Sequence, residues 1–260
     1  MKVLLINLDR ATDRLERMRR VFGEAGIEFE RVSGVDGSQL SAEELERCQP
    51  QPGYFGWLAK GELGCFLSHR LCWKRIAEGP HEHVAVFEDD IVFGSDAAAL
   101  LADTQWVPAD ADIVKLDAAP FRTYIGRDGK DLPGGRRLHR LCFNHYCTGG
   151  YIISKRAAAY LLKESEILRA PVDEFMFNVV SPAFRRSRVY QVVPALCTQE
   201  RYVFPQNDGE PGSYIEGRQF KRRLRLGRKL IRELYSGFNR VCSWFGLRQR
   251  RKIGFDLPYL

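Results

Sequence analysis

The sequence predicts an α/β fold, in which helices flank a mixed, mostly parallel central sheet. Short apolar runs of strand length alternate with longer segments whose apolar residues recur every three to four positions. The composition is ordinary for a globular protein, with 45% hydrophobic and 28% charged residues. A chain of 260 residues also buries enough surface to fold without a disulfide or metal. In such sheets, ligands bind beyond the carboxyl ends of the strands.

The first elements follow from simple patterns. Residues 2–7 form a short apolar run, which is typical of a buried strand. A helix closed by Gly26 comes next, because the following apolar residues have helical spacing: Leu15, Met18, Val21, Phe22 and Ala25. A second strand is expected at 28–32, before a turn over 34–37. Ser41 then caps another helix with acidic residues in its first turn.

The rest of the chain continues this alternation. Residues 49–56 hold two Pro and two Gly, which predicts a loop. A helix is predicted at 61–78 and a strand at 83–87. The same patterns predict further helices at 95–103, at 155–164 and from Pro171, and further strands at 112–116, 148–154 and 189–193. Residues 118–137 are rich in Pro, Gly and charge, so we expect a mobile loop there.

The C-terminal residues 216–252 carry most of the positive charge. They hold 13 Lys and Arg against two Glu, whereas the whole chain has a net charge of only +7. Apolar residues recur from Phe220 at alternating spacings of four and three, which predicts a basic amphipathic helix, broken near Gly237. Such a helix suits anionic lipid. Packing on the rest of the protein is the alternative, and nucleic acid fits an apolar face less well.

The N-terminus predicts no export signal. Four apolar residues precede the first charge after Lys2, whereas a signal peptide needs about 7–15. No window reaches the roughly 18 apolar residues of a transmembrane helix. We therefore expect a cytoplasmic protein whose seven cysteines are reduced.

Three adjacent carboxylates, Glu88-Asp89-Asp90, lie between two apolar runs. They repel one another and lose hydration on folding, and a divalent cation would remove both costs. In an extended segment, Glu88 and Asp90 point one way and Asp89 points the other. Oxygen ligands suit Mg²⁺ or Mn²⁺. The alternative is an acidic turn in water.

Two other groups of polar residues are less specific. Glu62 and His69 share one face of the predicted helix, but a buried histidine and a first-turn glutamate would look the same. A second group follows the first strand, where α/β folds favour phosphate, although helix capping also explains it; its members are Asn7, Asp9, Arg10 and Arg14. No Rossmann, P-loop or hydrolase-elbow motif occurs, and the cysteines and histidines lack zinc spacing.

Six short segments of the chain, taken in order, carry a recognisable pattern. The spacing of about twenty residues between the third segment and the fourth is the most specific part of it. The segments are Ile6-Asn7-Leu8-Asp9-Arg10 with Arg14, Val35-Asp36-Gly37, Gly61-Glu62-Leu63-Gly64-Cys65 with Ser68-His69, Phe87-Glu88-Asp89-Asp90, Thr148-Gly149-Gly150-Tyr151-Ile152-Ile153-Ser154 and Pro171-Val172-Asp173. In these segments the sequence resembles glycosyltransferase family 25, the lipooligosaccharide galactosyltransferases and collagen galactosyltransferase domains. The resemblance covers about residues 1–200 and leaves out the tail.

The resemblance implies a GT-A-like catalytic domain, which we place at residues 1–215. The charge and apolar spacing of the following residues predict a separate helical tail over 216–260. The resemblance also implies a nucleotide-sugar donor, usually UDP-galactose, and transfer with inversion. Glu88 and Asp90 become the Mn²⁺ or Mg²⁺ ligands of a DxD-type motif whose first residue is Glu. Which carboxylate contacts the metal stays open. The donor-binding residues it implies are Asn7, Asp9, Arg10, Arg14, Asp36, Ser68, His69, Asp89, Gly149 and Gly150.

An inverting transfer needs a base that takes the proton of the acceptor hydroxyl. Asp173 is the predicted base, because it follows Pro171 at a helix start. It lies past the glycine pair Gly149-Gly150, which we expect to let the backbone approach the sugar. Helix capping is the alternative role for Asp173. Glu62, which we include among the predicted catalytic residues, and Glu174 are reserve candidates for the base.

The sequence as a whole predicts a glycosyltransferase on the inner face of a membrane, which extends a lipid-linked oligosaccharide or another glycan. Residues 216–252 would contact the anionic membrane surface, and no nucleic-acid partner is expected. The competing hypothesis is a non-enzymatic adaptor built on a degenerate transferase domain. Retention of Glu62, His69 and the three carboxylates argues against degeneracy. The sugar, the acceptor and the oligomeric state stay open.

Overall fold

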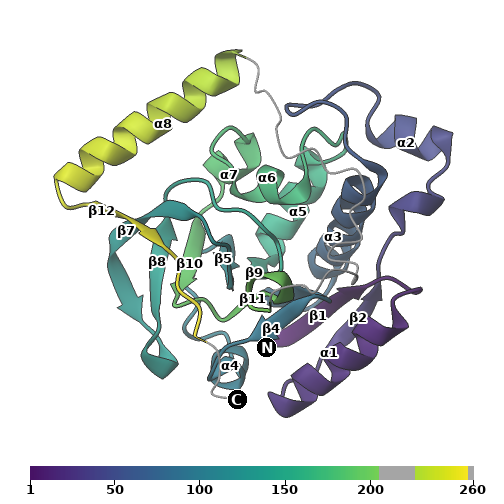
Figure 1. Ribbon diagram of the computed structural model, residues 1–260, viewed down its shortest axis with the longest axis horizontal. Coiled ribbons are helices and arrows are strands. Elements are labelled where there is room, and N and C mark those ends of the chain that lie inside the picture. Colours follow the sequence, from purple (N-terminus) through teal and green to yellow (C-terminus); the bar gives the residue numbers. More distant parts are fainter. Residues whose placement is uncertain (205–225, 257–260) are drawn as a thin grey trace.

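The computed structural model describes residues 1–204 and 226–256, and it confirms the α/β fold class (Figure 1). A main sheet has nine strands in the order β12-β7-β8-β10-β5-β9-β3-β1-β2, and a small sheet has the order β4-β11-β6. In chain order the strands are β1 (Lys2–Asn7), β2 (Glu30–Ser33), β3 (His83–Glu88), β4 (Ile91–Phe93), β5 (Ile113–Lys115), β6 (Asp117–Ala118), β7 (Arg122–Asp131), β8 (Arg137–Leu141), β9 (Gly150–Ser154), β10 (Val189–Val193), β11 (Cys197–Gln199) and β12 (Arg248–Lys252).

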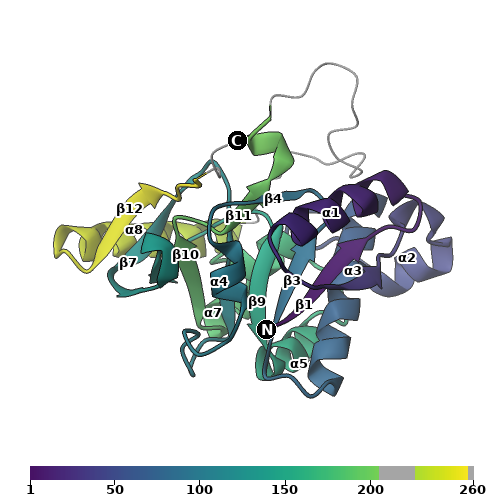
Figure 2. The same cartoon turned by 90° about the horizontal axis from the view of Figure 1, so that it is seen from below.

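Helices connect these strands and cover both faces of the main sheet (Figures 1 and 2). The α-helices are α1 (Thr12–Glu24), α2 (Ala42–Cys48), α3 (Lys60–Glu78), α4 (Ala97–Leu101), α5 (Lys155–Glu164), α6 (Val172–Phe177), α7 (Pro182–Arg186) and α8 (Leu226–Trp244). The 3₁₀ turns are η1 (Gly37–Gln39), η2 (Pro133–Gly135) and η3 (Glu200–Tyr202).

Each face of the sheet has its own apolar core. Leu4 and Ile6 of β1 pack in the cluster that contains residues of α3, α5 and α6. Val3 and Leu5 pack in the cluster that contains residues of α1 and α4. This alternation is the two-residue period of a strand that is buried on both faces.

The main sheet is mixed, but it is less parallel than expected. β1 pairs in parallel with β2 and β3, and β10 pairs in parallel with β5. The other strand pairs described for this sheet are antiparallel. The parallel strands β1 and β3 end at the same edge, where Asn7 and Glu88 are their last residues.

Residues 118–137 do not form the predicted loop. Half of them belong to β7, which pairs antiparallel with both β8 and β12. In β7 only Thr123, Tyr124 and Ile125 are buried, and the polar residues that follow are largely exposed. Hydrogen bonds to two neighbouring strands, rather than buried side chains, therefore define this strand. An apolar pattern could not reveal it.

The tail is partly helix and partly sheet. α8 confirms the amphipathic helix, but it runs unbroken through Gly237, contrary to the predicted break. A helical glycine costs about 1 kcal/mol relative to alanine and leaves the backbone hydrogen bonds in place. Residues 248–252 were expected to continue the helical tail but form β12. The expected helix start at Phe220 lies outside the described residues, and the boundary after residue 215 stays a prediction.

One side of α8 packs on the rest of the protein, at the end of the molecule opposite α1 and α2 (Figures 1 and 2). Asn239 and Cys242 are buried, and Asn239 Nδ2 donates to Cys142 O over 3.2 Å. Arg228 lies 3.2 Å from the ring centroid of Tyr54. Exposed apolar side chains form what we call the apolar face of α8: Leu226, Leu230, Leu234, Phe238, Val241 and Phe245. In the part of the chain described, no helix is long and apolar enough to cross a bilayer.

Candidate functional site

A cavity of about 390 Å³ opens beside the carboxyl ends of β1 and β3. Ligands were expected at this edge of the sheet. Most of the predicted site residues line the cavity: Asn7, Arg10, Arg14, Asp36, Glu62, Ser68, Glu88, Asp89, Asp90 and Asp173. Asp9, His69, Gly149 and Gly150 are not among its lining residues.

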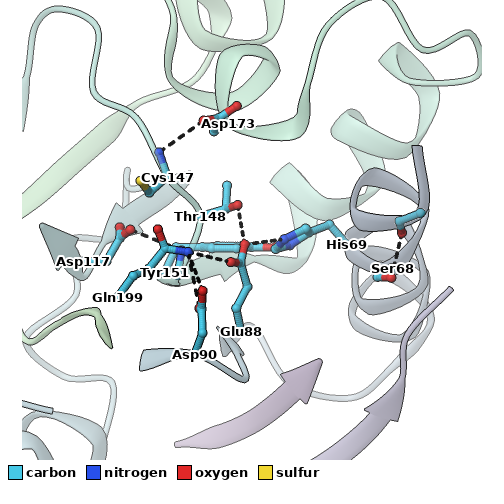
Figure 3. A network of polar contacts seen from close by, with 12 residues as sticks. Ser68, His69, Glu88, Asp90, Asp117, Cys147, Thr148, Tyr151, Asp173 and Gln199 are labelled. Atoms are coloured by element: carbon cyan, nitrogen blue, oxygen red, sulfur yellow. Dashed lines mark hydrogen bonds and ion pairs between the residues drawn. The ribbon is translucent and has the colours of Figure 1, made fainter. Parts of the chain in front are cut away.

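Glu88 and Asp90 converge at one wall of the cavity (Figure 3). Gln199 Nε2 donates to Glu88 Oε2 over 3.2 Å and to Asp90 Oδ2 over 3.1 Å, so a single amide bridges both carboxylates. We refer to Glu88, Asp90 and Gln199 as the carboxylate site. The prediction that Glu88 and Asp90 share one side is confirmed, even though residues 89–90 form a turn between β3 and β4.

Asp89 points to the other side, as predicted. Its Oδ2 accepts a hydrogen bond of 2.7 Å from Asn7 Nδ2, and its Oδ1 lies 3.1 Å from Arg14 Nη1. Arg17 Nη2 donates to the Asp89 carbonyl over 2.8 Å. These bonds fasten the turn after β3 to the end of β1 and to α1. Asp89 and Asn7 therefore hold the wall of the cavity together, in addition to lining it.

The pKa values of Glu88 and Asp90 are shifted in opposite directions. Burial, and then the negative charges of Glu88 and Asp89, raise the pKa of Asp90 to about 7. Burial also acts to raise the pKa of Glu88, but hydrogen bonds from His69 and Thr148 hold it below the ordinary value. Neighbouring carboxylates whose pKa values are shifted apart are typical of functional sites.

A chain of buried hydrogen bonds orients Glu88. Trp73 Nε1 donates to the Tyr151 hydroxyl over 2.9 Å, so that hydroxyl is free to donate to His69 Nδ1, also over 2.9 Å. The network thus assigns the His69 proton to Nε2, which donates to Glu88 Oε1 over 3.1 Å. His69 is fully buried and acts behind the carboxylate, so it does not reach the cavity as expected of a donor-binding residue.

Two glycines bring the turn over residues 34–37 against the start of α3. A Cβ at Gly37 would lie 1.8 Å from Lys60 O, and a Cβ at Gly64 would lie 2.5 Å from Gly37 N. Ser68 Oγ accepts from Val35 N over 2.8 Å and donates to Gly64 O over 2.7 Å. This contact places Asp36 at the cavity, where its Oδ2 lies 2.6 Å from Arg10 Nε.

A second turn, residues 147–149, is fixed from behind by a buried ion pair. Lys115 and Asp117 are both fully buried and bonded to each other. Lys115 Nζ donates to Cys147 O over 2.6 Å, and Asp117 Oδ2 accepts from Gly149 N over 3.1 Å. Cys147 has a φ of 70°, which is unusual for a residue with a side chain. The turn presents Thr148, whose Oγ1 donates to Glu88 Oε1 over 2.5 Å.

Asp173 lies across this turn from the carboxylate site (Figure 3). It is 5% exposed and lines the cavity. Its Oδ2 accepts from Cys147 N over 3.4 Å, and its Oδ1 accepts from Glu174 N over 2.9 Å in the first turn of α6. Glu62 is also buried, but its Oε2 caps α3 by accepting from Ala59 N over 2.9 Å.

Three predicted roles need correction. Asp9 is exposed and pairs with Arg31 over 2.6 Å, away from the cavity lining. A Cβ at Gly149 would lie 3.1 Å from Ile91 Cγ2, and one at Gly150 would lie 2.6 Å from Cys197 Sγ. The space opposite each missing side chain is therefore filled by protein atoms, and both glycines lie outside the cavity lining.

Sequence reasoning missed several residues of the site. Thr148 stood in a recognised motif, but it had no predicted role. Gln199 ends β11 and Arg201 lies in η3, and neither residue was considered. Arg201 Nη2 donates to Gln199 Oε1 over 2.7 Å and lines the cavity, which orients the amide toward the carboxylates. Lys115 was hidden in an apolar strand. A lysine in the middle of a buried strand is the one signal that could have drawn attention to it.

The carboxylate site fits a divalent cation. Two carboxylates share one neutral donor, and the raised pKa of Asp90 indicates that positive charge is needed there. Oxygen ligands of this kind suit Mn²⁺ or Mg²⁺. Cys65, His69 and Glu88 also have ligand atoms within 4.8 Å of one another. Both nitrogens of His69 are already hydrogen-bonded, however, so the carboxylate pair is the better site.

The chain is similar to proteins of known families. It matches glycosyltransferase family 25 (LPS biosynthesis protein) over residues 1–176. It is 32% identical to the lacto-N-neotetraose biosynthesis glycosyltransferase LgtE of Neisseria meningitidis serogroup B, over 96% of this chain and 91% of that protein. It is 35% identical to procollagen galactosyltransferase 1-A of Xenopus laevis, over 67% of this chain and 30% of that protein.

Among solved structures, the chain resembles a glycosyltransferase involved in the glycosylation of the major capsid of PBCV-1. The TM-score is 0.45 at 12% identity, and the match covers 91% of this chain and 98% of that chain.

Proposed function

Because the chain belongs to glycosyltransferase family 25, we propose that it transfers galactose from UDP-galactose to a lipooligosaccharide or a related glycan, with inversion. The names of its relatives, a lacto-N-neotetraose biosynthesis glycosyltransferase and a procollagen galactosyltransferase, support this donor and this class of acceptor. The structural observation that carries the proposal is the convergence of Glu88 and Asp90 on the cavity, next to Asp173. A degenerate adaptor would have no need of such a site.

Donor binding is assigned to the side of the cavity formed by β1, α1 and the start of α3. Cationic side chains line it and complement a diphosphate: Arg10, Arg14 and Lys60. Glu88 and Asp90 would hold Mn²⁺ or Mg²⁺, which as a Lewis acid stabilises the negative charge on a leaving diphosphate. His69 and Thr148 keep Glu88 ionised and oriented toward the cavity.

Asp173 is the proposed general base. The acceptor hydroxyl oxygen forms a bond to the anomeric carbon while the bond from that carbon to the diphosphate oxygen breaks. The electron pair of the broken bond leaves with UDP, and the hydroxyl proton passes to the Asp173 carboxylate. Attack opposite the leaving group inverts the configuration. Cys147 N and Glu174 N orient the carboxylate through hydrogen bonds.

The apolar face of α8 is the proposed contact with an anionic membrane surface on the cytoplasmic side. Residues 226–252 hold Lys and Arg at eight positions against one Glu. Each Lys or Arg near such a surface is worth about 1 kcal/mol. Exposed Leu and Phe side chains add insertion energy without spanning the bilayer. The notion that the helix either packs or binds lipid is too simple, since one side packs while the other is exposed.

The test is a donor screen with the full chain, Mn²⁺ and an array of immobilised glycans. We expect transfer of galactose from UDP-galactose, and much less from UDP-glucose or UDP-N-acetylglucosamine. Asp90→Ala should abolish transfer and weaken Mn²⁺-dependent UDP binding in calorimetry, while circular dichroism stays unchanged. Asp128→Ala, an exposed change on β7, is the matched control. Transfer of another sugar would correct the donor, and full Mn²⁺-dependent activity in Asp90→Ala would remove the metal site.

A further inference from the structure

We propose that three aromatic side chains, Phe121, Tyr146 and Tyr202, form the subsite that binds the acceptor glycan. We call them the aromatic rim. This inference rests on the proposed function and deepens it, because it assigns the acceptor to one end of the cavity. The occupant is a pyranose sugar, whose flat face of C–H groups packs on aromatic rings while its hydroxyl groups stay in water or bind polar neighbours.

The aromatic rim lies next to the cavity, because Tyr146 precedes Cys147 in the chain and Tyr202 contacts it, and Cys147 lines the cavity. Phe121 is 48% exposed, and its ring centroid lies 5.2 Å from that of Tyr146 in an edge-to-face arrangement. Tyr202 is 37% exposed, and its hydroxyl lies 3.5 Å from Cys147 Sγ. Arg201 lies 4.8 Å from the centroid of the Tyr202 ring, so this ring is supported from one side. Exposed rings grouped next to a cavity indicate a binding surface.

The segment from Tyr146 to Thr148 connects the aromatic rim to the reacting groups. Thr148 bonds Glu88 of the carboxylate site, and Cys147 N bonds the proposed base Asp173. Tyr146 is the next residue outward. Its pKa is raised by burial and then by the charges of Glu174 and Asp173, in keeping with its place beside the base. Cys147 therefore contacts both the proposed base and one ring of the aromatic rim.

The other end of the cavity is unlike the aromatic rim. Around Asp36, Lys60 and Arg10 the lining is charged or polar, which suits a nucleotide diphosphate. A nucleotide base could also stack on aromatic rings. It would then have to lie on the Asp173 side, away from the cations and glycine-supported turn that we assign to the donor. With the acceptor on the aromatic rim, the acceptor lies on the side of Asp173 and the donor diphosphate lies beside the cationic side chains.

The experiment measures acceptor and donor constants separately in Phe121→Ala and in the conservative Phe121→Tyr. An aromatic contact is worth about 0.5–1.5 kcal/mol, so Phe121→Ala should raise the acceptor KM roughly 2–10-fold. The donor KM and the rate of UDP-galactose hydrolysis without acceptor should change less than about twofold. Phe121→Tyr should restore the acceptor KM. Leu71→Ala, which truncates an exposed apolar side chain of α3 outside the cavity lining, is the control.

A binding readout separates this proposal from the proposed function. Saturation-transfer NMR with lactose and a panel of free monosaccharides, in the presence of UDP and Mn²⁺, reports contact with sugar even if no donor is used. Binding that Phe121→Ala weakens supports the aromatic rim, whether or not galactose is transferred. A raised donor KM with an unchanged acceptor KM, or sugar binding that is unaffected in Phe121→Ala, overturns it. So does a wild-type protein that binds no saccharide of the panel.

Discussion

The carboxylate site and the apolar face of α8 differ in where their side chains find partners. Glu88 and Asp90 accept hydrogen bonds from residues of other elements, so their positions are set before any ligand arrives. Leu234 and Phe238 are 63% and 56% exposed, although Arg248 lies 4.9 Å from the centroid of the Phe238 ring. The first region is thus defined by internal contacts, whereas the second leaves apolar side chains exposed, which is the basis of its proposed membrane contact.

The largest expected effect lies at the base. Asp173→Asn should keep donor binding but lower turnover by about 10²–10⁴, the usual worth of a general base. Steady-state kinetics with UDP-galactose and calorimetry with UDP give the two values. Glu62→Gln, which alters the cap of α3, should cost stability more than turnover. Normal turnover with weak donor binding in Asp173→Asn would make this residue a binding group.

The buried pair behind the site should be next in size. Lys115→Met leaves Asp117 buried without its cation and should lower the free energy of unfolding by about 3–5 kcal/mol. Urea unfolding at neutral pH measures the change. The matched control is Lys229→Met on exposed α8, which should change stability by less than about 0.5 kcal/mol. Equal effects in both variants would erase the contrast between the two regions.

The pH dependence of stability should reveal the electrostatic cost of ionising Asp90 in the carboxylate site. The pKa of Asp90 is about 7 in the folded protein and 3.8 in the reference state, so its contribution to stability is present in acid and is lost as the pH rises through 7. In EDTA at about pH 8, Asp90→Asn should therefore be more stable than the wild type by roughly 1–3 kcal/mol, after allowance for solvent screening.

Thermal unfolding from about pH 4 to pH 8 tests that expectation, since the advantage of Asp90→Asn should vanish in acid. Asp89→Asn is the comparison, because Asp89 is paired with Asn7 and Arg14 and should lose stability when neutralised. A wild type as stable as Asp90→Asn at high pH would mean that the two carboxylates do not oppose folding.

The smallest effect is expected on α8. Replacing Leu234 and Phe238 together by Ser should lower partition onto anionic vesicles about tenfold or more, because each apolar side chain contributes roughly 1.5–3 kcal/mol when fully buried. Transfer to a short soluble acceptor should be unchanged. Co-sedimentation at low and high salt is the measurement, with Leu71→Ser as the control. Full-length protein that stays in the supernatant at low salt would end the membrane proposal.

Local patterns predicted much of both regions. The alternation of a strand placed Glu88 and Asp90 on one side, and helical spacing revealed the apolar face of α8. The remaining features could not be predicted, because they depend on pairing between strands that are far apart in the sequence. Gln199 is 111 residues from Glu88 and reaches it only because β11 pairs with β4. Likewise, β7 and β12 have many exposed polar residues, and their pairing with each other and of β7 with β8 defines them as strands.

The glycines of the sequence motifs also could not be interpreted without the structure. The sequence indicated that Gly149 and Gly150 matter, but the reason for a glycine depends on what lies opposite its missing side chain. For Gly150 this is Cys197 of another strand, and for Gly64 it is the backbone of the turn at Gly37. A motif identifies a position under constraint, whereas only the packed chain shows whether a ligand or protein imposes that constraint.

β12 also has a consequence for the synthesis of the chain. It is the outermost strand of the main sheet, yet it lies close to the C-terminus. While the ribosome is still making residues 248–252, one side of the ten-residue β7 has no strand partner in the described part of the chain. Such an edge is a template for pairing with other molecules. A product that stops early should therefore aggregate, so deletion of the tail tests sheet closure as much as membrane contact.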